Sequence, residues 1–148
     1  MKIRAMAIED YEEVFALWER IRGFAIRSID DSKESIEAFL RRNPSTSMVA
    51  IQGGEVVGSV LCGHDGRLGS LYHVCVDSAY RKQGIGSAMV TEAVVALEQE
   101  GISKVCLIAF TNNQVGNTFW RELKWQRRED INYYEKILNK NNKITYVT

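Results

Sequence analysis

Residues 74–87, VCVDSAYRKQGIGS, constrain the fold of this chain more than any other stretch. A β-like run of alternating apolar residues leads into a short polar turn, and a long helical period follows the turn. The first turn of a helix has backbone N–H groups without internal partners and the positive end of the helix dipole. Gly84 and Gly86 remove side chains at that point, and Arg81 and Lys82 place two cations beside it. The stretch therefore predicts a binding site for a phosphate or pyrophosphate.

Two common nucleotide-binding motifs do not fit these residues. A Walker A loop needs a lysine directly after its last glycine, and none follows Gly86. A Rossmann fingerprint needs a third glycine where Met89 stands, and no early βαβ unit surrounds the stretch. The remaining alternative is that the two glycines only permit a tight turn between strand and helix.

The rest of the chain reads as one α/β (α+β) domain with a mixed sheet. Helical spacing of apolar residues predicts helices over residues 10–23, 32–42, 84–100 and 113–123, with Asp31 as the cap of the second. β-like runs predict strands over residues 2–7, 48–52, 55–62, 71–76, 103–110, 124–128 and 131–138. The Gly53-Gly54 pair predicts a tight hairpin turn, and the almost wholly apolar run 103–110 predicts a strand buried on both faces.

The pattern R-x-x-G-x-G at residues 81–86 resembles the acetyl-CoA-binding motif of the GCN5-related N-acetyltransferase (GNAT) superfamily. Residues 53–58 resemble the second hairpin of that family, and residues 113–125 resemble its late helix and strand. The resemblance covers residues 2–138 and is closest to small bacterial members with a similar Gly-x-Asp-Gly turn.

This resemblance implies a mostly antiparallel sheet of six to seven strands with about four helices. The sheet would splay apart between its fourth and fifth strands, which here are residues 71–76 and 103–110. We expect a single domain over residues 1–138 and a polar tail over residues 139–148 that frays.

The resemblance also implies where acetyl-CoA, the co-substrate, would bind. The backbone of the central strand would pair with the pantetheine arm like an added strand, and amides of the glycine-containing turn would hold the pyrophosphate. One face of the late helix would meet the same cofactor. The implied cofactor-binding residues are Val74, Val76, Arg81, Lys82, Gln83, Gly84, Ile85, Gly86, Ser87, Ala88, Asn113 and Trp120.

The implied reaction is direct transfer of an acetyl group from acetyl-CoA to an amine in a ternary complex. A strand amide near Cys75 would stabilise the negative charge on the thioester oxygen, as in the family. His73 is a candidate general base because imidazole titrates near neutral pH. The alternatives are that His73 only fills a half-buried position, or that a carboxylate acts through water as the base. His64 and Asp65 lie in a glycine-rich turn that either borders the acceptor pocket or only shapes the turn.

The general acid is the point at which this chain departs from the family pattern. Trp120 stands where a tyrosine commonly donates a proton to the thiolate, and an indole has no accessible pKa. Either Tyr133 or Tyr134 supplies this proton, or the thiolate leaves unaided. The alternative function is a non-catalytic or regulatory acyl-CoA-binding module.

Composition argues against several other partners. The chain of 148 residues has 19 basic and 19 acidic residues, without the cationic excess that a nucleic-acid binder needs. Its longest apolar run, residues 105–110, is far shorter than the roughly 20 residues of a membrane span. We therefore expect neither a nucleic-acid partner nor a membrane association.

Three cysteines, Cys62, Cys75 and Cys106, lie far apart among apolar residues. This pattern is typical of reduced, buried thiols and favours a cytoplasmic location. No C-x-x-C pair is present, so we expect no metal site. The amine acceptor, a small molecule or a protein amine, has no sequence signature, and a homodimer is the default expectation for assembly.

Overall fold

A computed structural model describes residues 1–147 of the chain. It contains four α-helices and seven strands, which confirms the predicted α/β fold class. The helices are α1 (Tyr11–Arg20), α2 (Lys33–Arg42), α3 (Ile85–Gln99) and α4 (Gln114–Glu122). The strands are β1 (Lys2–Ala5), β2 (Ala25–Arg27), β3 (Met48–Gln52), β4 (Glu55–His64), β5 (Gly69–Val76), β6 (Val105–Cys106) and β7 (Ile144–Tyr146). Two 3₁₀ turns, η1 (Ile8–Asp10) and η2 (Ser78–Tyr80), complete the list.

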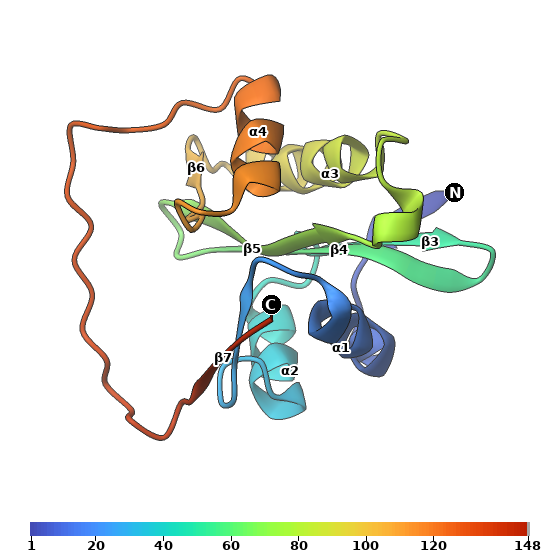
Figure 1. Cartoon of the computed structure of the whole chain (residues 1–148), viewed down its shortest axis with the longest axis horizontal. Coiled ribbons are helices and arrows are strands. Elements are labelled where there is room, and N and C mark those ends of the chain that lie inside the picture. The colour runs from blue at the N-terminus through green and yellow to red at the C-terminus, as the bar shows by residue number, and fades with distance from the viewer. Residues whose placement is uncertain (148) are drawn as a thin grey trace.

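Five strands form one sheet in the order β1-β3-β4-β5-β6, and β2 pairs with β7 in a separate two-stranded sheet. All pairs are antiparallel except β5 with β6, which is parallel. Helices α3 and α4 lie on one face of the larger sheet, and α1 and α2 lie on the other (Figure 1). The molecule therefore has three layers, with the sheet in the middle.

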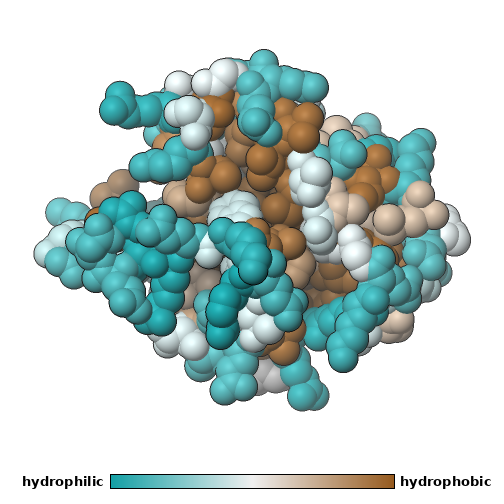
Figure 2. All heavy atoms as spheres, turned by 90° about the horizontal axis from the view of Figure 1, so that it is seen from above, coloured by the Kyte–Doolittle hydropathy of each residue, from teal (hydrophilic) through white to brown (hydrophobic). Residues whose placement is uncertain are grey.

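Each face of the sheet buries its own core. On one face the apolar stripe of α3 is buried as its spacing of four predicts: Ile85, Met89, Ala93 and Leu97 are each at most 2% exposed. On the other face α1 buries Val14, Leu17 and Trp18 completely. Seen from the α3/α4 side, apolar residues occupy the middle of the surface and polar residues surround them (Figure 2). Within residues 1–147, no helix combines the length and apolar character that crossing a bilayer requires.

The hairpin between β3 and β4 confirms the turn predicted from Gly53-Gly54. Both glycines have positive φ, +60° and +79°, which is the left-handed region that a tight primed turn requires. Gly101, with φ +83°, ends α3 as expected for the residue after a helix C-cap.

The prediction for residues 103–110 is wrong in two respects. Only Val105–Cys106 forms a strand, and the segment alternates between half-buried and exposed side chains instead of being buried on both faces. Ile108 is 68% exposed and Phe110 is 40% exposed. These side chains are more exposed than predicted because β6 is the edge strand of the sheet and only the α3/α4 layer covers it.

The predicted closing strands over residues 124–128 and 131–138 are also absent. Residues 126–140, which we call the strap, are all exposed and belong to no helix or strand (Figure 1). Within the expected C-terminal tail, Ile144–Tyr146 forms β7 and pairs with β2; Thr148 lies outside the described residues. Since β7 lies in the α1/α2 layer, the strap must cross from one layer of the molecule to the other.

Candidate active site

The sheet opens between β5 and β6, as the family resemblance implies. The two strands pair only at Gly69 with Val105 and at Ser70 with Cys106. Beyond that point, residues 71–76 of β5 have no strand partner on the β6 side within the described chain. An unpaired strand edge offers N–H and C=O groups that an extended ligand can satisfy. The opening is therefore suited to a strand-like arm.

A β-bulge lies in the open part of β5. Ser59 pairs with Cys75 and Leu61 pairs with Tyr72, so two β5 residues, His73 and Val74, face one residue of β4. His73 has φ +50°, a left-handed conformation that costs a non-glycine residue roughly 1–2 kcal/mol. The extra residue shifts the alternation of side chains, so His73 follows Tyr72 onto the α1/α2 face instead of pointing toward α3.

The turn before α3, residues 81–86, is called the glycine turn below. Lys82 and Gly84 both have positive φ, +63° and +78°, and residues of this kind occur in the turns whose backbone N–H groups bind anions. Gly84 is the N-cap of α3, and no side chain caps this helix end. A Cβ atom at Gly84 would meet nothing within 4 Å, so the space outside the turn is open. These features fit a pyrophosphate group, which would accept hydrogen bonds from the free amides.

Gly86 has a packing role in addition. A Cβ atom there would lie 3.2 Å from the ring of Phe119 on α4. A close approach of this kind leaves little room for any larger residue, and it brings α4 against the start of α3. Phe119, which the sequence did not single out, is therefore the α4 side chain that contacts the glycine turn.

Charged side chains surround the glycine turn. The Arg81 side chain donates from Nε to the backbone oxygen of Val76, 3.3 Å away, and Lys82 is exposed. Arg20 forms an ion pair with Asp77 at 2.8 Å. A backbone hydrogen bond from Ala79, with help from Arg20, lowers the pKa of Asp77. Three cations thus lie near the end of β5, two of them already oriented by hydrogen bonds.

His73 lies in a small cluster on the α1/α2 side of the opening. Its Nε2 is 2.8 Å from Oδ1 of Asp31, and its ring lies 4.6 Å from the Trp18 ring and 4.9 Å from the Phe24 ring. Both partners of this contact are shielded, with the His73 and Asp31 side chains 17% and 6% exposed. Ser32, and not Asp31 as predicted, caps α2 by accepting from the backbone N–H of Ser35. The Asp31 carboxylate cannot serve as the cap because His73 and a backbone amide occupy it.

Cys75 is unsuited to act as a nucleophile. It is buried, and burial raises the pKa of its thiol to about 11, so almost none is thiolate near neutral pH. Its Sγ lies 3.5 Å from the hydroxyl of Ser59, which also accepts from the Trp18 indole. Burial likewise raises the pKa of Cys62 to about 12. Cys106 is exposed, which corrects the expectation that all three thiols are buried.

Comparison with known proteins identifies the family. The sequence model of the Acetyltransferase (GNAT) family matches residues 8–125. The chain belongs to this family. It is 32% identical over 131 residues to the acetyltransferase SG1711 of Sodalis glossinidius, covering 88% of this chain and 91% of that protein. It is 33% identical over 140 residues to the acetyltransferase plu1384 of Photorhabdus laumondii, covering 93% and 96% of the two chains.

The fold matches solved members of the family. PaiA N-acetyltransferase from Thermoplasma acidophilum, solved in complex with coenzyme A, superimposes with a TM-score of 0.70 at 19% identity. The match covers 82% of this chain and 87% of the other. Acetyl-CoA is the co-substrate of GNAT enzymes, and the open β5 edge and the glycine turn are the features of this chain that fit it.

Two residues expected on the cofactor face of α4 have other contacts in this GNAT chain. Asn113 caps α4 by accepting from the N–H of Gly116 at 2.9 Å, and its amide donates to the backbone oxygen of Gly23 at 3.4 Å. Trp120 packs between the rings of Phe119 and Trp125. These contacts favour the packing interpretation that the sequence left open for Trp120.

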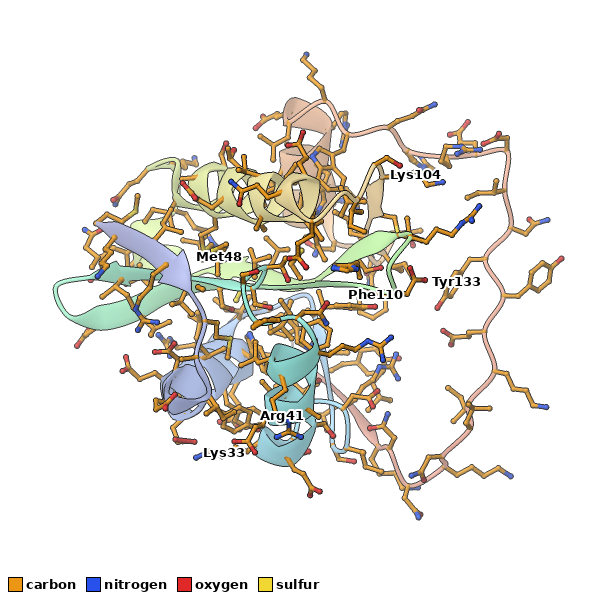
Figure 3. The ribbon with its side chains drawn as sticks, turned by 180° about the vertical axis from the view of Figure 1, so that it is seen from behind. Lys33, Arg41, Met48, Lys104, Phe110 and Tyr133 are labelled. Carbon is orange, nitrogen blue, oxygen red and sulfur yellow. The ribbon has the colours of Figure 1, made fainter. Side chains whose placement is uncertain are left out.

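The candidate general acids lie in the strap. Tyr133 is 66% exposed and donates to Glu135, which raises the pKa of Tyr133. Figure 3 shows its side chain pointing from the strap toward the body of the molecule, on the side where Phe110 lies. Tyr134 is 87% exposed. Within residues 1–147, neither hydroxyl is hydrogen-bonded to β5, α3 or α4.

His64 and Asp65 lie at the opposite end of β5 from the glycine turn. His64 Nε2 is 2.9 Å from Glu100 at the end of α3, and its Nδ1 accepts from the N–H of Gly66. Oδ1 of Asp65 accepts hydrogen bonds from the backbone N–H groups of Leu68 and Arg67. These bonds lower the pKa of the Asp65 carboxyl. This pair therefore stabilises the β4–β5 turn and does not join the His73 cluster.

Sequence reasoning missed Asp31, Trp18 and Phe24 as neighbours of His73. Trp18 carried a signal, since it lies on the apolar stripe of the first helix, but that stripe predicts only burial. Asp31 carried a misleading signal, because an acidic residue just before a helix usually caps it. No local pattern could have paired it with a residue 42 positions away.

Proposed function

We propose that this chain transfers the acetyl group of acetyl-CoA directly to an amine in a ternary complex. The observation that carries the proposal is the open edge of β5, which runs from the bulge at His73 to the uncapped start of α3. A ligand with an extended amide-containing arm and a pyrophosphate fits this combination of a free strand edge and free helix amides.

The residues have separate tasks in this proposal. Backbone groups of Val74 and Val76 pair with the pantetheine amides, and amides from Gln83 to Ala88 hold the pyrophosphate, with Arg81 and Lys82 beside it. Bound acetyl-CoA supplies an activated thioester carbon. His73 takes the proton of the attacking amine from the α1/α2 side, which its ring faces. The thiolate takes a proton from water, because the α4 face presents Trp120, which has no proton to give as an acid.

Direct transfer is supported over an acyl-enzyme by the state of Cys75. A buried thiol with a pKa near 11 has no base to activate it within hydrogen-bonding distance, only the Ser59 hydroxyl. We expect Cys75→Ala to retain turnover within about threefold. A loss of turnover together with a trapped acetyl-protein would instead indicate a covalent route.

The experiment that tests the function has two measurements. Titration calorimetry with acetyl-CoA measures binding, and a thiol-reactive dye measures CoA release in the presence of a panel of amines. Binding together with amine-dependent CoA release supports the proposal. Binding without CoA release for any amine would favour a non-catalytic acyl-CoA-binding module, and no binding would reject both functions.

We further propose a primary amine, either a small molecule or a protein amine, as the acceptor. The free thiols Cys62, Cys75 and Cys106 support a reducing, cytoplasmic setting. A homodimer is proposed as the assembly, and sedimentation velocity at micromolar concentration tests it.

A further inference from the structure

We infer that Asp31 is a positioning residue for the reaction: it holds His73 in the tautomer that carries its hydrogen on Nε2 and leaves Nδ1 free to accept the amine proton. This inference rests on the proposed function, because it gives a mechanism for the general base of that reaction.

The contacts of Asp31 leave its carboxylate no freedom. Oδ1 lies 2.8 Å from His73 Nε2, and Oδ2 accepts from the backbone N–H of Arg27 at 2.7 Å. The backbone oxygen of Asp31 accepts from the hydroxyl of Tyr11 at 2.6 Å. The side chain is only 6% exposed. Three elements, α1, β2 and β5, therefore meet at this one residue.

The imidazole is held as firmly as the carboxylate. Trp18 and Phe24 contact the His73 ring, and the β-bulge fixes the backbone that carries it. Without the bulge, the alternation of β5 would turn this side chain toward α3, away from Asp31. His73 therefore keeps a strained left-handed backbone, and this conformation brings its imidazole to the buried carboxylate of Asp31, next to Val74.

The tautomer follows from hydrogen-bond chemistry. An ionised carboxylate only accepts hydrogen bonds, so the ring nitrogen that faces it must carry the hydrogen. In a neutral imidazole the other nitrogen, Nδ1, then has the lone pair. When the amine nitrogen bonds to the acetyl carbon, the carbon–sulfur bond breaks and its electron pair goes to sulfur. The amine proton goes to Nδ1, and the Asp31 carboxylate stabilises the positive charge on the ring. The thiolate takes a proton from water, and the hydroxide that remains takes the proton from Nδ1, which restores the neutral ring.

Asp31→Asn tests this inference because the hydrogen bond from the Arg27 N–H to the residue 31 side chain fixes the orientation of the new amide. The Arg27 N–H requires an oxygen, so the NH₂ group of the asparagine would face His73 and force Nε2 to accept. The hydrogen then moves to Nδ1 and the base is lost. We expect kcat to fall by roughly 10²–10⁴-fold, with the KM for acetyl-CoA within about twofold of the wild-type value.

Asp30→Asn is the matched control. Asp30 is the neighbouring acidic residue, is exposed, and accepts only from the Asn142 side chain. We expect its kcat to stay within about twofold of wild type. Equal kcat values for wild type and Asp31→Asn would overturn the inference, as would equal losses in the two variants.

The tautomer of His73 can also be measured in the wild-type protein, so this test does not depend on whether a variant folds. Nitrogen-15 shifts of the His73 ring at pH above 8 distinguish the tautomers, and we expect hydrogen on Nε2. A majority of the Nδ1–H tautomer would overturn the inference. His73→Asn, whose side chain tolerates a left-handed backbone, should lose kcat to the same extent as Asp31→Asn while still binding acetyl-CoA. The proposed function fails separately, if the wild-type protein neither binds acetyl-CoA nor releases CoA.

Discussion

The glycine turn and the strap are both irregular segments that follow a regular element, yet they differ in what determines their path. The glycine turn is compact, and positive φ angles at Lys82 and Gly84 lead directly into α3. The strap also follows a left-handed residue, Lys124, but then continues extended and exposed until it approaches β7. Among residues 1–147, its side chains pair only with near neighbours, as Arg128 does with Asp130.

The difference lies in the distance over which each segment is specified. Residue types within the glycine turn are sufficient to define it, because two glycines and a helix start determine where the backbone goes. The strap is held at its ends, by α4 and by the pairing of β7 with β2, which lies more than a hundred residues earlier in the chain. Local sequence therefore predicts the first segment and mispredicts the second.

The largest expected effect is on cofactor binding, and it uses two glycines with nearly the same φ. Gly84 has φ +78° and Gly54 has φ +79°, and a Cβ atom at either would meet nothing within 4 Å. Valine therefore introduces similar backbone strain at both sites. We expect Gly84→Val to weaken acetyl-CoA binding by at least about 100-fold, because its side chain fills the space for the pyrophosphate, and Gly54→Val to leave binding within threefold.

Calorimetry measures both affinities, and thermal unfolding confirms that both variants are folded. Gly86→Val should lose binding as well, since its side chain must displace Phe119. If Gly84→Val bound acetyl-CoA with full affinity, the glycine turn would not be part of the binding site.

A matched pair of leucines compares the packing of α3 with that of the strap. Leu97 on α3 is 2% exposed, whereas Leu138 in the strap is 90% exposed. We expect Leu97→Ala to lower the free energy of unfolding by about 2–5 kcal/mol and Leu138→Ala to change it by less than about 0.5 kcal/mol. Urea denaturation measures both. A large loss for Leu138→Ala would show that the strap is packed in solution, within one chain or against another.

A pair of aspartates extends the comparison to pH. Asp77 beside the glycine turn has a pKa lowered by the Ala79 N–H and by Arg20, and Asp130 in the strap has one lowered by Arg128. A lowered pKa in the folded state adds stability above the unfolded pKa near 3.9, and this stability is lost as pH falls. We expect Asp77→Asn to lower Tm by about 1–2 °C at pH 7, and we expect this difference to disappear as pH falls through the folded-state pKa of Asp77.

Asp130→Asn should differ less from wild type, because its ion pair is exposed and salt screens it. Thermal scans at low and high salt separate the two variants. The comparison is contradicted if the Tm difference from wild type changes more with pH for Asp130→Asn than for Asp77→Asn.

The smallest expected effect concerns the tyrosines of the strap. Since Tyr133 donates to Glu135 and Tyr134 is almost fully exposed, the double change Tyr133→Phe and Tyr134→Phe should leave kcat within about twofold. CoA-release kinetics measure this. A fall of tenfold or more would mean that the strap closes over the opening during turnover and supplies the proton to the thiolate.

Much of the fold could be predicted because its periodicity is local. The buried stripe of α3, the glycine hairpin and the strand before the glycine turn all follow from spacing and turn chemistry. The edge position of β6 could not be predicted, because an apolar run such as residues 105–110 has the same sequence pattern whether one face or both faces of the strand are covered. Likewise β7 depends on a partner far away in the sequence.

The site divides in the same way. The shape of the glycine turn could be predicted, since free amides and missing side chains are local properties. Its role in binding acetyl-CoA stays a prediction. The surroundings of His73 could not be predicted, because they depend on a bulge and on Asp31, which contacts the ring from just before α2. Trp120 shows a third case, in which helical spacing placed the side chain correctly on α4 but could not tell packing from contact with a ligand.

The pairing of β2 with β7 has a consequence for the order of folding. β7 pairs with Arg27, whose backbone amide holds Asp31, so residues 144–146 support the surroundings of His73 although more than a hundred residues separate β7 from β2 in the chain. The strand pairs of the central sheet are much closer in sequence. A chain that has already formed this sheet and α3 must therefore still close one long loop before Asp31 is fully held.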